Sequence, residues 1–190
     1  MVSQLSRLRP PTPRHLHVID GQIQVFTCTC RSFFTDVMAQ ALRAAGQGTP
    51  VLVVQFLKGG IGQGPEHPVQ LGQHLDWLRC GLTRRVDALQ LADAQAEVQS
   101  DAQIDGADAD ALRHLWQHTQ TIVGQGRYSL VVLDELSLAI KFNLVSADEV
   151  LAFLNQRPPH VDVVLTGPEM PSAILQVADQ VTELRRSHRF

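Results

Sequence analysis

Short apolar segments alternate with helix-like segments along most of this chain, and this alternation limits the folds that it can adopt. The apolar runs lie at residues 22–27, 50–57, 129–133, 161–166 and 181–184. The run at 50–57 is typical of a strand that is buried on both faces. Because helical segments separate the runs, the sequence predicts a doubly wound α/β domain, built on a mostly parallel sheet of five or six strands.

The predicted helices differ in how clearly their ends are marked. They cover residues 33–46, 91–104, 107–124, 147–156 and 171–179. Glycines follow the first and third helices, as expected at helix C-termini. Ser146 and Glu149 have the spacing of a capping box at the start of the fourth. Between the glycine-rich loop after residue 57 and residue 90, the pattern does not distinguish helix from strand.

Length and composition suit one globular domain of 190 residues. We expect this domain to cover residues 21–190, after a flexible, proline-containing arm at 1–20. Three cysteines without a secretory signal pattern predict a reducing compartment, the cytoplasm. A net charge of −3 predicts no nucleic-acid partner, and no apolar run reaches the roughly 18 residues of a membrane span.

The first apolar run leads through a polar turn into a helix, which is the arrangement of a phosphate-binding loop. In such a loop, glycines let backbone N–H groups surround the phosphate, and a lysine neutralises it. Here the turn contains neither residue type; it reads Cys28, Thr29, Cys30, Arg31 and Ser32, followed by Phe33 and Phe34. The arrangement therefore indicates a nucleotide-binding ancestry, whereas the residues predict that phosphate binding has been lost.

Several polar segments follow predicted strands and should meet at one edge of the sheet, because ligands of parallel sheets bind beyond the strands' carboxyl ends. They are the 28–35 loop, the 58–68 loop with Lys58, the pair Asp134 and Glu135, and the pair Thr166 and Gly167. An acid after a buried strand binds metal in phosphate-loop proteins, although it can also cap a helix. We expect an inherited site position without retained Mg²⁺, since Mg²⁺ usually needs phosphate ligands.

Cys28 and Cys30 form a C-x-C pair at the start of a predicted helix. A helix N-terminus lowers thiol pKa values and so favours metal capture or oxidation. A zinc site needs four ligands, and only folding could bring His67 or Cys80 to this pair. The simpler interpretation is that small side chains fill a former phosphate pocket, and we predict no resident metal.

Two further groups of side chains carry weaker signals. His114 and His118 are four residues apart on a predicted helix, but without an acidic third ligand nearby we expect a solvated helix face. A basic patch would form if the fold brought together the arginines at 79, 84, 85, 185, 186 and 189.

Five motifs, in this order and spacing, carry a resemblance to a known family. They are ALRAAGQG at 41–48, VVQFLKGG at 53–60, YSLVVLDELSLAI at 128–140, NQRPPHVDVVLTG at 155–167 and ADQVTELR at 178–185. The chain resembles the P-loop type of ATP:corrinoid adenosyltransferase, in which a Co(I) nucleophile attacks the 5′ carbon of ATP. The resemblance implies a P-loop NTPase-like fold, a possible homodimer and, if the chain is active, the use of ATP, Mg²⁺ and a corrinoid.

The loop of that family reads T-G-x-G-K-G-K-T-T and lies on Thr27 to Thr35 without a gap. Its glycines fall on Cys28, Cys30 and Ser32, its essential lysine on Phe33 and its first threonine on Phe34. A threonine at 27, a cation at Arg31 and a hydroxyl at Thr35 are retained. Forcing a side chain into a left-handed glycine conformation costs about 1–2 kcal/mol, and a missing lysine–phosphate contact about 1.5–3 kcal/mol.

Two other family features are altered. The aromatic G-F-T-W segment, which helps to hold the corrinoid, corresponds to Gly81, Leu82, Thr83 and Arg84. Relatives also tend to continue into a tail that covers the active site, whereas this sequence stops at Phe190.

Three hypotheses follow from these observations. The first is a non-catalytic or repurposed homologue without a required cofactor, which binds an unknown small molecule or protein. The second is an active adenosyltransferase in which Arg31, Thr35 and the 58–64 loop replace the usual contacts. The third is a redox- or metal-responsive protein that uses Cys28 and Cys30.

Overall fold

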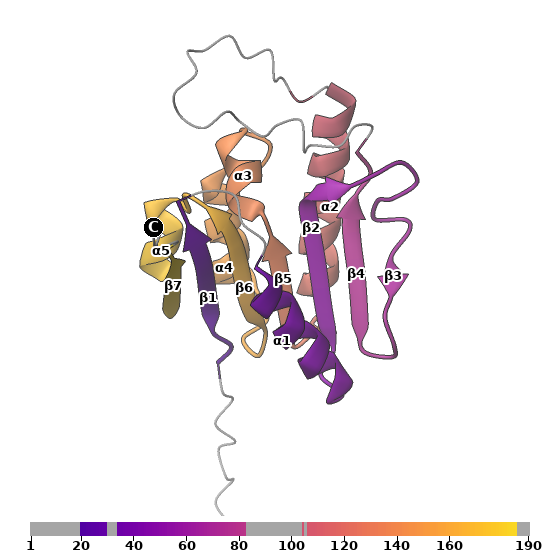
Figure 1. Ribbon diagram of the computed structural model, residues 1–190, viewed down its shortest axis with the longest axis vertical. Coiled ribbons are helices and arrows are strands. Elements are labelled where there is room, and N and C mark those ends of the chain that lie inside the picture. Colours follow the sequence, from indigo (N-terminus) through magenta and orange to yellow (C-terminus); the bar gives the residue numbers. More distant parts are fainter. Residues whose placement is uncertain (1–19, 30–33, 83–103, 105, 186–190) are drawn as a thin grey trace, which may run out of the picture.

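A computed structural model describes residues 20–29, 34–82, 104 and 106–185 of the chain (Figure 1). Its elements, in chain order, are β1 (Ile23–Cys28), α1 (Thr35–Gly46), β2 (Val51–Gly59), β3 (Val69–Gln70), β4 (Leu75–Cys80), α2 (Gly106–Gly124), β5 (Leu130–Asp134), α3 (Leu136–Lys141), α4 (Ala147–Gln156), β6 (Asp162–Pro168), α5 (Ser172–Val177) and β7 (Gln180–Leu184).

The strands form one seven-stranded sheet in the order β3-β4-β2-β5-β6-β1-β7. Each neighbouring pair is parallel except β3 and β4. The predicted α/β fold with a mostly parallel sheet is therefore confirmed. The predicted number of strands was too low, because the unassigned segment before residue 90 contributes both β3 and β4.

The two faces of the sheet carry separate apolar clusters. On one face, here called the α1 face, Val53, Val132 and Val164 pack with residues of α1. The opposite face is covered by α2, α3, α4 and α5, and in Figure 1 α1 lies in front of the sheet whereas α2 lies behind it. There Trp116 packs between Phe56 and Phe153, with ring centroids 6.0 and 5.3 Å apart. The larger core thus lies on the face away from α1.

Helix predictions are confirmed where strong end signals exist. The helix expected at 107–124 is α2, and α4 covers 147–156. Its capping box forms as predicted: Glu149 N–H donates to Ser146 Oγ at 3.1 Å, and Ser146 N–H donates to Glu149 Oε2 at 2.9 Å. The short helix α3 was not predicted, because its six residues are too few to establish a helical period.

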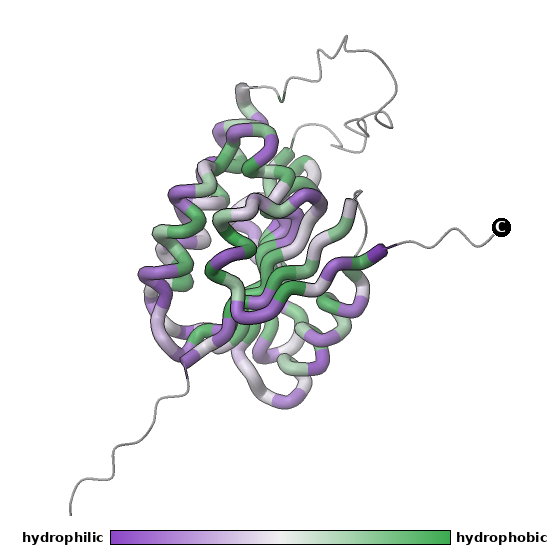
Figure 2. Tube along the Cα trace, turned by 90° about the vertical axis from the view of Figure 1, so that its left-hand side faces the viewer, coloured by the Kyte–Doolittle hydropathy of each residue, from purple (hydrophilic) through white to green (hydrophobic). Residues whose placement is uncertain are grey.

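Hydropathy along the trace separates a mainly apolar interior from polar outer turns (Figure 2). The predicted arm at 1–20, apart from residue 20, and the predicted helix at 91–104, apart from Ile104, lie outside the described residues. Among the helices that the structure describes, none combines the length and hydrophobicity of a membrane span.

The amino end of the sheet contains a buried phenol. Tyr128 precedes β5 and donates its hydroxyl hydrogen to Asp76 Oδ2 on β4, at 2.6 Å. Burial, followed by this hydrogen bond and the charge of Asp76, raises the pKa of Tyr128 from 10.0 to about 12. Because the folded state disfavours the phenolate, the stabilisation is complete below the unfolded pKa and is lost as the pH rises through the folded one.

We expect Tyr128→Phe to lower the free energy of unfolding by about 1 kcal/mol at pH 7, through loss of one hydrogen bond. The variant should also lose less stability than the wild type between pH 10 and 12, the window set by the two pKa values of Tyr128. Urea unfolding from pH 7 to 12 measures both effects. Since Tyr128 is the single tyrosine of the chain, an unchanged alkaline slope would contradict this assignment.

Candidate functional site

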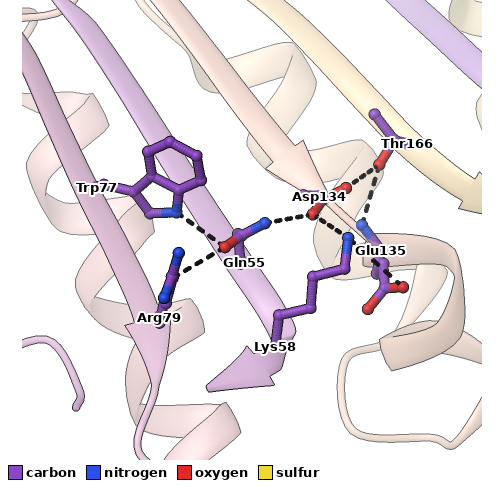
Figure 3. A network of polar contacts seen from close by, with 7 residues as sticks. All are labelled: Gln55, Lys58, Trp77, Arg79, Asp134, Glu135 and Thr166. Atoms are coloured by element: carbon purple, nitrogen blue, oxygen red, sulfur yellow. Dashed lines mark hydrogen bonds and ion pairs between the residues drawn. The ribbon is translucent and has the colours of Figure 1, made fainter. Parts of the chain in front are cut away.

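Four polar side chains occupy the same level on four adjacent strands, and we call them the polar row (Figure 3). They are Arg79 on β4, Gln55 on β2, Asp134 on β5 and Thr166 on β6. The strand register pairs Gln55 with both Arg79 and Asp134, and Leu133 with Leu165, one residue before Asp134 and Thr166. Because side chains alternate along a strand, the row lies on the α1 face, near the carboxyl ends.

Asp134 connects the polar row to a lysine. Its carboxylate is 1% exposed. Thr166 Oγ1 donates to Oδ1 at 2.7 Å, whereas Gln55 Nε2 and Lys58 Nζ both donate to Oδ2 at 2.8 Å. Protein donors therefore engage both carboxylate oxygens, and the ammonium group of Lys58 neutralises the buried charge.

Gln55 is held in one orientation by its neighbours. Its Oε1 accepts hydrogen bonds from Trp77 Nε1 at 2.9 Å and from Arg79 Nε at 3.0 Å. Both nitrogens can only donate, so the amide oxygen must face them and the NH₂ group must face Asp134. The amide thus links the charged centre at β5 to the side chains of β4.

Glu135 adopts the left-handed conformation, with φ 62°, directly after β5. Its N–H donates to Thr166 Oγ1 at 3.1 Å, and its carboxylate oxygen lies 3.8 Å from Lys58 Nζ. The hydroxyl of Thr166 therefore accepts from Glu135 and donates to Asp134, which fixes its direction. A non-glycine residue in this conformation stores backbone strain of about 1–3 kcal/mol, a feature frequent at functional sites.

Gly167 allows β6 to approach α3 and β1 closely. It has φ 139°, and a Cβ atom at this position would collide with Ser137 Oγ. Its carbonyl accepts a hydrogen bond from Thr27 Oγ1 at 2.9 Å. The predicted rim residues Lys58, Asp134, Glu135, Thr166 and Gly167 thus lie together, although Lys58 belongs to β2 rather than to the following loop.

The start of α1 lies on a buried phenyl ring. Phe34 is 4% exposed and packs in the apolar cluster with Cys28 and Val37. It occupies the N-cap position without a side-chain hydrogen bond to the helix, and Thr35 after it is exposed. Of the predicted loop positions, Cys30, Arg31, Ser32 and Phe33 lie outside the described residues.

The fold separates the two thiols that the structure describes. Cys28 lies on the α1 face of β1, whereas Cys80 is buried in the opposite cluster on β4, with β6, β5 and β2 between them. Cys80 therefore does not complete a metal site with Cys28, and His67 is exposed. Among the described residues, no three histidine, cysteine or acidic side chains form a group that could hold a metal ion.

The remaining predicted positions are dispersed. His114 is exposed and His118 half-buried on α2. Arg79 and Arg185 lie on β4 and just beyond β7, which are separated by β2, β5, β6 and β1, so these two arginines do not share a basic patch. Leu82, at the position of the family's first aromatic residue, is 1% exposed. Thr83 and Arg84 lie outside the described residues.

Sequence reasoning did not identify Gln55 or Trp77 as residues of this site, and it did not predict the contact that Arg79 makes with Gln55. Gln55 gave a usable signal, since it is the single polar residue in the apolar run at 50–57. A buried polar side chain needs hydrogen-bond partners, so this interruption indicates a polar contact inside the sheet. Trp77 and Arg79 could not be linked to it without the register of β2 and β4.

Comparison with known proteins gives consistent matches over most of this chain. A family model described as ATP:corrinoid adenosyltransferase BtuR/CobO/CobP matches residues 20–190. Corrinoid adenosyltransferase of Escherichia coli K12 is 31% identical over 166 residues, which cover 87% of this chain and 76% of the relative. Corrinoid adenosyltransferase CobA of Salmonella typhimurium LT2 is 32% identical over the same lengths. Corrinoid adenosyltransferase of Pseudomonas aeruginosa PAO1 is 31% identical over 155 residues, which cover 79% and 68%.

We expect Gln55→Leu to lower the free energy of unfolding by about 1–3 kcal/mol, because it leaves Trp77 Nε1 without its acceptor and removes one of the donors to the buried carboxylate of Asp134. Urea unfolding at neutral pH measures the loss. Gln70→Leu, at an exposed position of β3, is the matched control and should change stability by less than about 0.5 kcal/mol. Equal effects of the two substitutions would contradict a structural role for the Gln55 amide.

The thiol of Cys80 should be unreactive in the folded protein. Burial, followed by the charge of Asp108, raises its pKa from 9.0 to about 12, against a smaller opposing effect of the Gly81 N–H. Since the thiolate is the reactive form, we expect Cys80 to react with a disulfide reagent at neutral pH only after unfolding. Mass spectrometry of labelled peptides, with and without denaturant, identifies the site; rapid native labelling of Cys80 would disprove the assignment.

Proposed function

Because the chain belongs to the ATP:corrinoid adenosyltransferase family, we propose that it acts in cobalamin metabolism as a binding homologue that does not transfer adenosine from ATP. The family match over residues 20–190 supports the first part of this proposal, and the residues at the former nucleotide loop support the second. The ligand or protein that it binds differs from Mg·ATP. Its proposed role is to bind this partner as a regulatory protein.

The buried ring of Phe34 is the observation that carries the proposal. In a phosphate-binding loop, the first helical turn offers N–H groups and a hydroxyl to the phosphates and Mg²⁺. Here the helix starts on an apolar side chain that packs into the core with Cys28 and Val37. Such an anchor offers no ligand to Mg²⁺ and holds this end of α1 by hydrophobic burial instead.

The buried acid of β5 also fits Mg²⁺ poorly. Each oxygen of Asp134 already accepts a hydrogen bond, and one of the donors is the cation of Lys58. A metal ion at this carboxylate would have to take the place of Lys58, whose ammonium group already neutralises the charge of Asp134. The residues present therefore do not fit the Mg·ATP that the family implies, and we assign no catalytic step to it.

The corrinoid contacts of the family are not retained in kind either. The position aligned with the first aromatic residue is Leu82, which is buried in the core cluster and offers almost no surface to a corrinoid. A corrinoid, if bound, would need other side chains. Hypotheses that depend on Arg31 or Cys30 stay predictions, since both residues lie outside the described ranges.

We expect no Mg·ATP binding tighter than millimolar by isothermal titration calorimetry, and no formation of adenosylcobalamin from reduced corrinoid. The Escherichia coli K12 relative, which is 31% identical, provides the positive control. Micromolar Mg·ATP binding, or transfer at a rate comparable with the control, would reject the proposal in favour of an active enzyme with an unusual ATP site.

Restoring the loop provides a gain-of-function test. The combined substitution Cys28→Gly, Cys30→Gly, Ser32→Gly, Phe33→Lys and Phe34→Thr recreates the family pattern. We expect at least tenfold tighter Mg·ATP binding, because one regained charged phosphate contact contributes about 1.5–3 kcal/mol. The matched control carries Phe33→Ala with the other four changes and should show a smaller gain. No gain in either variant would show that the loop sequence does not limit ATP binding.

A further inference from the structure

We propose that Arg79 receives an oxyanion group, a phosphate or a carboxylate, from a ligand that binds at the carboxyl edge of β2 and β4. This inference rests on the proposed function, because it places the anion site of the chain on β4 instead of the altered loop. No residue of the former nucleotide loop takes part in it.

The guanidinium group of Arg79 is held in place by two contacts. Nε donates to Gln55 Oε1 at 3.0 Å, and the guanidinium carbon lies 5.4 Å from the ring centroid of Trp77, within cation–π range. Trp77 itself packs against the apolar cluster of the α1 face. The long side chain is therefore positioned before a ligand arrives, which reduces the conformational entropy lost on binding.

The outer edge of this guanidinium group is available for a ligand. Within the described residues, no acceptor bonds Nη1 or Nη2 of Arg79, and no carboxylate lies within ion-pairing distance. Other arginines differ: Arg113 pairs with Asp110, Arg185 pairs with Glu183, and Arg157 binds three backbone carbonyls. Arg79 thus combines a fixed orientation with an uncompensated charge.

The position of Arg79 suits a ligand of this fold. It lies one residue before the end of β4, in register with Gln55, and ligands of parallel α/β sheets bind beyond the carboxyl ends of strands. In Figure 1, α1 crosses the lower part of the sheet, whereas the arrowheads of β2 and β4 point upward, beyond it. Arg79 is exposed there, and Lys58 with a side chain 22% exposed lies on the adjacent strand.

The chemistry of the free edge determines the class of ligand. The two Nη groups lie in one plane and can donate in parallel to two oxygens of a phosphate or carboxylate. Lys58 contributes little additional charge, because it is paired with Asp134 and lies near Glu135. The site should therefore prefer one bidentate oxyanion group over a polyanion that needs several cations.

Tryptophan fluorescence can report occupancy of this site. The chain has two tryptophans, and Trp116 is 2% exposed in the opposite core, so an anion at Arg79 should change the emission of Trp77. We would titrate the full chain, without Mg²⁺, with pyrophosphate and separately with citrate. We expect a saturable change with at least one probe, and the preferred probe distinguishes a phosphate-bearing from a carboxylate-bearing ligand.

Variants test whether Arg79 makes the contact. Arg79→Lys keeps the charge but removes the planar guanidinium group, and Arg79→Gln removes both. We expect the affinity for the anion to fall about tenfold or more in each variant, because each loses a charge-assisted hydrogen bond. Arg113→Gln, at an exposed position of α2, is the matched control and should bind as the wild type does. Urea unfolding verifies that the variants are folded.

The possible outcomes separate this inference from the proposed function. The anion site is overturned if the wild type shows no saturable binding, or if both folded Arg79 variants bind with wild-type affinity. Either result leaves the proposed function intact. Adenosine transfer from Mg·ATP overturns the proposed function but does not affect an Arg79-dependent binding of pyrophosphate or citrate. Arg79-dependent binding together with inactive transfer supports both.

Discussion

The buried charge of Asp134 is the constraint on which the carboxyl edge of this protein depends. An isolated carboxylate inside a sheet is strongly unfavourable, so its partners must be present whenever the strands assemble. Lys58 and Gln55 come from β2 and Thr166 from β6, and Gln55 in turn orients Trp77 and Arg79 on β4. One charge thereby links four neighbouring strands. A shift of register in any of them would separate a donor from its acceptor, which makes the polar row a determinant of strand alignment.

This dependence on register explains which features could be predicted from the sequence. Strand and helix types follow from local periodicity, and parallel strands necessarily bring Asp134 and Thr166 to one edge. The contact between Gln55 and Arg79 follows no local pattern, because the two residues are 24 positions apart and meet only when their two strands align. Strand β4 itself was obscured by Asp76 and Arg79, which interrupt its apolar residues but have partners on neighbouring elements.

The larger core and the start of α1 depend on different interactions. The larger core, with Trp116 between Phe56 and Phe153, lies on the face away from α1 and contains none of the described residues of the 27–35 segment. On the α1 face, Phe34 and Cys28 supply apolar surface where the family has glycine and threonine. Burial of a phenyl side chain contributes about 1.5–3 kcal/mol, so the start of α1 can be held without any nucleotide. The proposed loss of phosphate binding is therefore compatible with a stable domain.

The acids at the carboxyl edge are neutralised from within the chain. Asp134 and Glu135 require a cation, and Lys58 supplies it from within the chain, so the fold does not need a metal ion to stabilise these acids. Because Lys58 is paired with Asp134, its movement to a phosphate would leave the buried carboxylate without its counter-charge. Arg79 has no such commitment, since its contact with Gln55 uses Nε alone. A ligand anion could therefore bind Arg79 without breaking an ion pair, whereas binding to Lys58 would compete with Asp134. Both residues lie at the same edge of the sheet.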